Sequence, residues 1–159
     1  MNSMRNMLLA ALVLIAVPSF DAPTAMAQDD AKVCKLAIAG TDAMQFDKKE
    51  LKVGADCAVV ELTLTHTGKL PKAAMGHNWV LTKTGDVNAV TSAGTAAGPG
   101  NDYVPSKDSR VIAATKLVGG GESSTIKFPT SKLTKGGDYT FVCTFPGHSA
   151  LMKGKLIFG

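Results

Sequence analysis

The sequence predicts an all-β domain built as a sandwich or barrel, and three observations lead to this fold class. Beyond residue 27, apolar residues almost never recur at helical spacing. Residues 60–66 alternate between apolar and polar side chains, and Val60, Leu62 and Leu64 fall on one face, which is the pattern of a half-buried strand. Glycine-rich turns at 119–121 and 136–138 separate other short apolar segments, as is typical of sandwiches and barrels.

Seven segments of the chain have a strand pattern, and one segment has a different character. The expected strands, in chain order, cover residues 35–39, 60–66, 78–84, 110–113, 124–128, 139–144 and 155–158. Residues 86–100 are rich in Ala, Gly, Ser and Thr, with Val87 and Val90 spaced three apart. This spacing predicts a short helical insertion between two strands. Neither an internal repeat nor a linker divides the chain, so we expect a single domain.

The first 27 residues have the layout of a cleavable secretory signal. Arg5 precedes an unbroken apolar run over residues 7–17, and Ala25 and Ala27 are the small residues that a signal peptidase reads. The run is well short of the roughly 20 residues that a membrane-spanning helix needs. We therefore expect cleavage near Ala27, a mature domain over residues 28–159, and export to the periplasm as a soluble protein. A buried N-terminal helix is the alternative for this segment.

Composition and charge exclude several classes of protein. Of the 159 residues, 45% are hydrophobic and 19% are charged, so we expect a folded domain rather than a disordered polyelectrolyte. The net charge of +4 is a mild excess without any run of five like charges, and it does not support nucleic-acid binding. Beyond the signal, no segment is long and apolar enough to insert into a membrane.

Export changes how the three cysteines are interpreted. In an oxidising compartment, an odd number of cysteines leaves one without a partner in the same chain, or bonded to another chain. Cys34 and Cys57 flank two short strand-like segments near the N-terminus and are the natural disulfide pair. Cys143 is then the unpaired thiol. In such a compartment it would be oxidised unless it is buried or bound.

Cys143 begins a segment that contains three kinds of metal ligand. The order is Cys-x4-His-x3-Met, in which His148 and Met152 follow the thiol and a Pro-Gly pair turns the chain between them. A second imidazole, His77, lies at the start of another predicted strand. If the two strands are neighbours, one thiolate, two imidazoles and a thioether converge. A trigonal His2Cys site with a weak axial Met is the signature of blue copper.

Four other interpretations of these residues have to be weighed. A single Cys on an apolar strand is often an inert small hydrophobe. Cys143 as an enzyme nucleophile would need a base oriented by a carboxylate or amide, but no acidic residue occurs between residues 139 and 159. A copper-delivery protein would use the same ligands in a more open site. A structural zinc site would use Cys and His, but Met152 would be a poor zinc ligand.

The segment over residues 143–154 resembles the C-terminal copper loop of the azurins, a family of cupredoxins. The similarity includes residues 70–81, residues 108–113 and the two early cysteines, and it spans residues 32–159. It implies an all-β fold, an eight-stranded Greek-key β-sandwich with one small helical flap on residues 86–100. It also implies a protein that is not an enzyme, binds one type 1 copper and carries single electrons.

The resemblance gives each residue around the motif a role. The three strong copper ligands would be His77, Cys143 and His148. On the axis of the site, Met152 would be a distant ligand on one side, and the backbone carbonyl of Gly76 would lie opposite it.

Four nearby residues would support the site without binding the metal. Asn78 would hydrogen-bond across to the Cys143 segment, and Trp79 would lie in the core. Phe145 would help to keep water away from the metal. His66 aligns with a non-ligand His and is expected to be a packed imidazole at a strand end.

An apolar surface for partner docking is also implied. His148 would reach the surface as the exit for the electron, within a ring of apolar residues that we call the docking patch. The docking patch consists of Met44, Leu70, Met75, Phe145, Pro146 and Ala150. Partners would be redox proteins such as c-type cytochromes or periplasmic reductases, which would bind transiently to a monomer.

Overall fold

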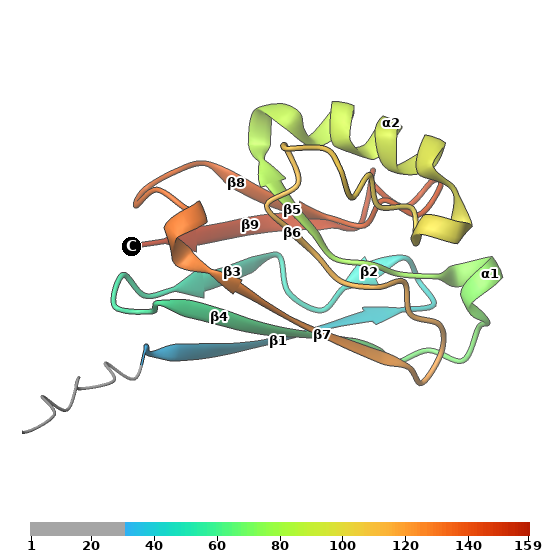
Figure 1. Ribbon diagram of the computed structural model, residues 1–159. Helices are drawn as coiled ribbons and strands as arrows, with labels where there is room; N and C mark the ends of the chain where they lie inside the picture. The colour runs from blue at the N-terminus through green and yellow to red at the C-terminus, as the bar shows by residue number, and fades with distance from the viewer. Residues whose placement is uncertain (1–30) are drawn as a thin grey trace, which may run out of the picture.

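Two β-sheets pack face to face, and a helix covers the outer face of one of them (Figure 1). The computed structural model describes residues 31–159. The predicted signal sequence over residues 1–27 and the predicted start of the mature domain at residue 28 lie outside the described residues.

The first sheet contains the two longest strands of the described chain. Its order is β2-β1-β4-β7. The strands are β1 (Val33–Thr41), β2 (Gln45–Phe46), β4 (Val59–His66) and β7 (Ser123–Pro129). β1 and β4 are parallel, with Gly40 opposite His66, whereas β4 and β7 are antiparallel. A tight hairpin cannot join parallel strands, and the chain instead crosses to the other sheet between β1 and β4.

The second sheet brings together strands from the middle and the end of the chain. Its order is β3-β9-β8-β5-β6. The strands are β3 (Glu50–Val53), β5 (Val80–Lys83), β6 (Ala113–Ala114), β8 (Tyr139–Val142) and β9 (Lys153–Phe158). β5 and β8 are antiparallel, with Val80 opposite Val142. The residues just before β5 therefore lie beside the residues just after β8.

The hydrophobic core lies between the two sheets, where the alternation in β4 is confirmed. Val60, Leu62 and Leu64 are fully buried, and the residues between them are partly exposed. Trp79 and Phe141 belong to the same cluster, with ring centroids 5.9 Å apart. Burying a large apolar side chain contributes about 1.5–3 kcal/mol. This burial fixes the register of β4, because a slip of one residue would turn its apolar face to solvent.

The predicted helical insertion is confirmed as α2 (Val87–Ala97), which packs on the outer face of the second sheet (Figure 1). Val90 is buried there in a small second core over β5 and β8. Gly94 lets the helix approach closely, because a Cβ at this position would lie 2.5 Å from the carbonyl oxygen of Tyr103. The other helical segments are α1 (Lys72–Met75), η1 (Thr84–Asp86), η2 (Pro99–Asn101) and η3 (Thr130–Lys132).

The Greek-key sandwich with a helical flap is confirmed, and the differences lie at the ends and edges of the sheets. Counting two-residue segments, residues 31–159 contain nine strands. β2, β3 and α1, which have two, four and four residues, are additions to the predicted segments. The expected strand at 110–113 is reduced to β6, because Arg110 is held in a turn by Asp108. β8 ends at Val142, so Cys143 lies in a loop.

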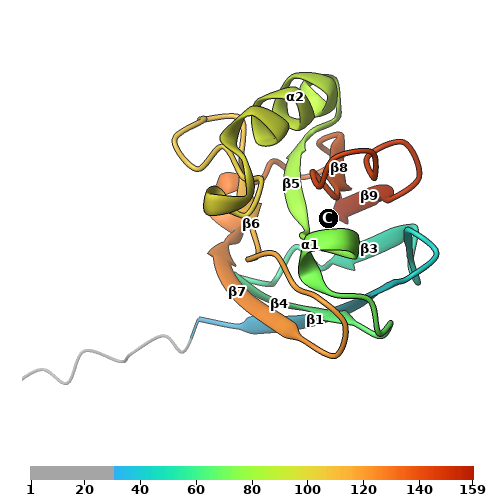
Figure 2. The same ribbon diagram turned by 90° about the vertical axis from the view of Figure 1, so that its right-hand side faces the viewer.

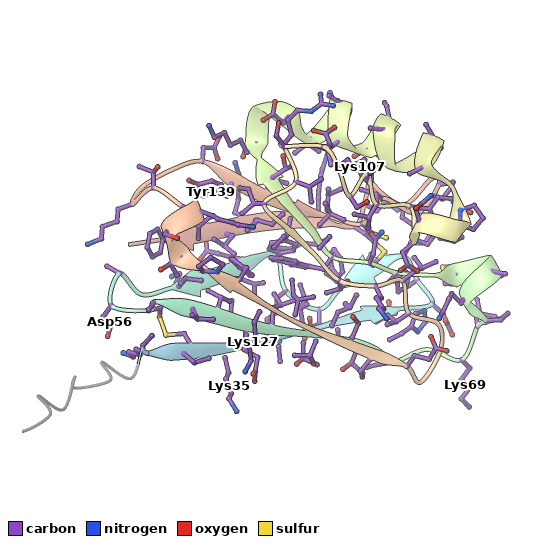
Figure 3. The ribbon with its side chains drawn as sticks, viewed as in Figure 1. Lys35, Asp56, Lys69, Lys107, Lys127 and Tyr139 are labelled. Carbon is purple, nitrogen blue, oxygen red and sulfur yellow. A yellow bond between two sulfur atoms is a disulfide. The ribbon has the colours of Figure 1, made fainter. Side chains whose placement is uncertain are left out.

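The predicted disulfide between Cys34 and Cys57 is confirmed, with the Cα atoms 5.7 Å apart. It ties β1 to the turn before β4. Figure 3 shows it beside Asp56, at the end of the molecule opposite Lys69. Cys143 is the free cysteine and is buried. Within the described chain, every helix is too short or too polar to cross a membrane.

Candidate metal centre

Three side chains that can bind a metal meet at the end of the sandwich where α1 lies, the end that faces the viewer in Figure 2. His77, Cys143 and His148 each offer one ligand atom, and these atoms all lie within 4.8 Å of one another. All three residues are buried. His77 lies just before β5 and Cys143 just after β8, so the antiparallel pairing of these strands brings them together.

His77 is held so that one ring nitrogen has a free lone pair. Its Nε2–H donates to the carbonyl oxygen of Thr41 at 2.9 Å, which leaves Nδ1 unprotonated in the neutral ring. Nδ1 is buried and has no hydrogen-bond partner among residues 31–159. Burial lowers the pKa of His77 and favours the neutral ring. Gly40 makes room for it, because a Cβ there would lie 2.6 Å from Cδ2 of His77.

His66 packs against His77 but uses both of its own ring nitrogens. The two rings stack with centroids 4.3 Å apart and an interplanar angle of 7°. The backbone N–H of Gly68 donates to Nδ1 of His66 at 3.0 Å, and Nε2–H donates to the carbonyl oxygen of Met75 at 2.9 Å. His66 therefore has no lone pair to offer a metal, which fits the packed, non-ligand role expected for it.

The Cys143 thiol is fully buried between the two histidines. Its Sγ lies 3.7 Å from Nδ1 of His148 and 4.0 Å from the carbonyl oxygen of Gly76. Burial raises the pKa of the Cys143 thiol to about 11, although backbone N–H groups of Asn78 and Phe145 oppose this rise. The thiol therefore stays protonated at neutral pH unless a cation replaces its proton.

Asn78 hydrogen-bonds across to the residue after Cys143, as expected. Its Nδ2 donates to Oγ1 of Thr144, and the backbone N–H of Thr144 donates to its Oδ1, each at 2.8 Å. Nδ2 also donates to the carbonyl oxygen of Asp102 at 2.8 Å. Thr144 in turn donates to the carbonyl oxygen of Tyr103 at 2.6 Å. The loop after α2 is thereby fixed against the loop that carries Cys143.

His148 lies under the surface, which corrects the expectation that it would reach the surface. Its exposed fraction is 3%. The ring of Phe145 covers it, with centroids 4.6 Å apart, because the turn at Gly147 (φ +83°) folds the two residues onto each other. Burial lowers the pKa of His148 to about 4, so its imidazole is neutral near pH 7.

The two residues expected on the axis of the site, Met152 and Gly76, both contact residues of the His77–Cys143–His148 set. The side chain of Met152 is fully buried in the main core, and its backbone forms hydrogen bonds with Cys143 and His148. The carbonyl oxygen of Gly76 faces the thiol of Cys143. A side chain at Gly76 would not fit, because its Cβ would lie 2.5 Å from the carbonyl oxygen of Lys72.

The residues of the predicted docking patch differ in their exposure. Leu70, Pro146 and Ala150 are exposed. The other three are half-buried, namely Met44, Met75 and Phe145. Leu151, which the sequence did not single out, has 53% of its surface exposed beside Ala150.

Several groups that shape the centre carry no signal in the sequence. The carbonyl oxygen of Thr41 fixes the tautomer of His77, and Val118 exchanges two backbone hydrogen bonds with it. Gly40 provides the space for its ring. Thr41 and Val118 act through backbone atoms, which every residue type has, and Gly40 acts because it has no side chain. The residue types at these positions therefore do not reveal the contacts.

The donor set fits copper. A buried imidazole nitrogen without a partner costs free energy unless something binds it, and Nδ1 of His77 is such an atom. Next to it lie a buried thiol and a second neutral imidazole. One soft thiolate and two imidazoles, with a thioether residue beside them, are the ligands that blue copper sites use.

Comparison with known proteins leads to the same metal. A family described as copper binding proteins, plastocyanin/azurin family, matches residues 32–159. The chain belongs to this plastocyanin/azurin family. As a family member with a buried His–Cys–His set, it is a blue copper protein that transfers electrons, and its centre takes one type 1 copper.

Within the plastocyanin/azurin family, the chain is similar to azurins. It is 51% identical to azurin of Bordetella pertussis over 153 residues, which cover 96% of this chain and 97% of the relative. It is 54% identical to azurin-1 of Alcaligenes xylosoxydans xylosoxydans over 123 residues, which cover 77% of this chain and 95% of the relative. Among solved structures, an azurin (Az-iso2) from Methylomonas sp. strain J matches with a TM-score of 0.77 and 40% identity, over 79% of this chain and 98% of that one.

Proposed function

We propose that the protein carries one electron at a time between redox partners in the periplasm. Its copper ligands would be His77, Cys143 and His148, with Met152 and the backbone carbonyl of Gly76 as weaker ligands. The periplasmic location is supported by the signal-like pattern of residues 1–27 and by the similarity to azurins.

The observation that carries this ligand assignment is the free lone pair on Nδ1 of His77. It lies in a buried site together with the only free thiol of the described chain and a second neutral imidazole. Copper bound there would supply a one-electron Cu(II)/Cu(I) couple at a site of one thiolate, two imidazoles and a thioether.

The chain's own residues keep the centre rigid and dry. Asn78 and Thr144 fix the two ligand strands to each other, and Thr41 holds the ring of His77 in one tautomer. The backbone N–H groups of Asn78 and Phe145 lower the pKa of Cys143 and so favour its thiolate, against the effect of burial. A site that changes little between two charge states loses little energy to rearrangement when an electron is transferred.

Docking would use the apolar patch around His148. Leu70, Pro146 and Ala150 present exposed apolar surface, and the ring of Phe145, which also belongs to the docking patch, packs on His148. A small patch of this kind favours weak and short-lived contacts, which suit a carrier that must leave each partner. We expect a monomer that binds c-type cytochromes or periplasmic reductases in turn.

Two rival functions have less support. A catalytic thiol needs a lowered pKa and access to a substrate, whereas burial raises the pKa of Cys143 to about 11. A copper-delivery protein needs ligands that exchange easily, whereas all three metal-binding side chains are buried.

The experiment that tests the proposed function is a visible absorption spectrum of the mature protein with Cu(II). We expect an intense thiolate-to-copper band in the red that ascorbate bleaches. The band should be missing in Cys143→Ser, which removes the thiolate but keeps the shape of the site. A colourless wild-type protein that still binds Cu(II) would contradict the assignment, and rapid loss of copper to a chelator would favour delivery.

A further inference from the structure

Asp42, in the turn after β1, fastens the loop that leads to His77. Its carboxylate oxygens accept the backbone N–H groups of Lys69 at 2.8 Å and Leu70 at 3.2 Å. The same two hydrogen bonds, that of Lys69 above all, lower the pKa of Asp42 and keep the acceptor charged. Hydrogen bonds to a charged acceptor are stronger than those between neutral groups. The exposed loop between β4 and α1 therefore has a firm attachment at this point.

Gly68 shows how closely the loop backbone approaches this carboxylate. A Cβ at Gly68 would lie 2.1 Å from Oδ1 of Asp42. Any larger residue there would displace the carboxylate from the two amides. The contact is thus a specific fit between one acid and one glycine.

The two residues before Asp42 contact both ends of the same segment. Gly40 packs against the ring of His77, and its carbonyl oxygen accepts the backbone N–H of Thr67 at 2.9 Å. The carbonyl oxygen of Thr41 accepts Nε2–H of His77 at 2.9 Å. Three consecutive residues at the end of β1 therefore hold the segment from Thr67 to His77 within its first four residues and at its last residue.

We propose that Asp42 is a positioning residue of the copper centre. Its carboxylate fixes the loop over residues 67–70 to the end of β1, and through that loop and α1 it sets where His77 lies relative to Cys143. The inference rests on the proposed role of His77 as a copper ligand. Metal ligands have to be held to within about 0.5 Å, and a loose segment before His77 would not do so.

The test compares two substitutions of Asp42 with a matched control. Asp42→Ala removes both the charge and the acceptor, whereas Asp42→Asn removes the charge but keeps one oxygen that can accept an N–H. Asp47→Ala is the control, because Oδ1 of Asp47 accepts the backbone N–H of Ala39 at 2.8 Å elsewhere on the same hairpin. Gly68→Ala is a second way to displace the carboxylate if Asp42→Ala fails to fold.

Two properties are measured on each variant. The first is amide hydrogen exchange at Lys69 and Leu70 in the diamagnetic Cu(I) protein, which reports on the attachment itself. We expect exchange at both amides to be about tenfold faster or more in Asp42→Ala and unchanged in Asp47→Ala. The second is the copper hyperfine splitting in the electron paramagnetic resonance spectrum of the Cu(II) protein, which reports on ligand geometry. We expect it to change in Asp42→Ala and Gly68→Ala, and by a smaller amount in Asp42→Asn, which keeps one of the two acceptor oxygens.

Two outcomes would overturn the proposal. Unchanged amide exchange at Lys69 and Leu70 in Asp42→Ala would mean that the carboxylate does not hold the loop. Faster amide exchange with an unchanged hyperfine splitting would also overturn it, because the loop would then be loose without moving His77. Failure of the proposed function is distinguishable, since it would appear in the wild-type spectrum as a missing thiolate-to-copper band.

Discussion

Asn78 and Thr144 are joined by a reciprocal pair of buried hydrogen bonds, each 2.8 Å long. Asn78 follows His77 directly, and Thr144 follows Cys143 directly. The pair therefore sets the separation of two metal-binding side chains by contacts that involve no metal. The pair therefore stabilises the fold and also fixes the distance between His77 and Cys143.

Replacing Asn78 by Ala should lower the free energy of unfolding substantially. The change leaves the buried N–H of Thr144 without its acceptor, and we expect a loss of about 2–4 kcal/mol. Urea unfolding at equal metal content measures it. Asn101→Ala is the matched control, because Asn101 donates one exposed hydrogen bond to Ala97 and should cost about 0.5 kcal/mol or less. Equal losses in the two variants would contradict the role given to Asn78.

Replacing Met152 by Leu should raise the reduction potential while the protein stays blue. Leu has nearly the volume of Met, so the core should lose less than about 1.5 kcal/mol. Without the weak thioether donor, Cu(II) loses stabilisation relative to Cu(I), and the surroundings of the metal become more apolar. Both effects raise the reduction potential. Cyclic voltammetry measures the potential. Met75→Leu, at the half-buried patch residue, is the control, and an equal shift there would argue against Met152 as the axial ligand.

A charge on the docking patch should slow electron exchange without disturbing the copper spectrum. Ala150 is exposed, and Ala150→Glu would place two like charges together when two copies meet through this patch. We expect electron self-exchange, measured by nuclear magnetic resonance line broadening, to fall about tenfold or more at low salt. Ile157→Glu is the control, because it puts the same charge outside the docking patch, on β9, where 43% of the Ile157 surface is exposed. It should exchange electrons at close to the wild-type rate. If both variants exchange at the wild-type rate, the patch is not the docking surface.

The ion pair of Asp108 with Arg110 should make stability depend on pH at the acid end. The side-chain hydrogen bonds from Arg110 lower the pKa of Asp108 from 3.8 to about 2. The folded state is thus stabilised at pH values above the ordinary pKa, and this contribution is lost as the pH falls through about 2. The difference in stability between the wild type and Asp108→Asn should shrink between pH 5 and pH 2. In an Arg110→Gln background that difference should be small at every pH.

The sequence by itself determined the elements whose signal is local. The alternation at Val60, Leu62 and Leu64 is visible in one segment and identifies a half-buried strand. The ligand types from Cys143 to Met152 lie within ten residues, so their chemistry could be interpreted before any strand pairing was known. The odd number of cysteines in an exported chain also indicated Cys143, because this argument needs only the count and not the fold.

Only the tertiary structure decided how distant segments meet. The pairing of β5 with β8 brings His77 to Cys143, and nothing in either segment states that they are neighbours. The short strands β2 and β3 exist because adjoining strands supply their hydrogen bonds, which two or four residues cannot signal alone. The burial of His148 depends on how Phe145 folds over it. Local residue types fix the chemistry of a side chain, whereas its position and exposure come from contacts with residues far away in the chain.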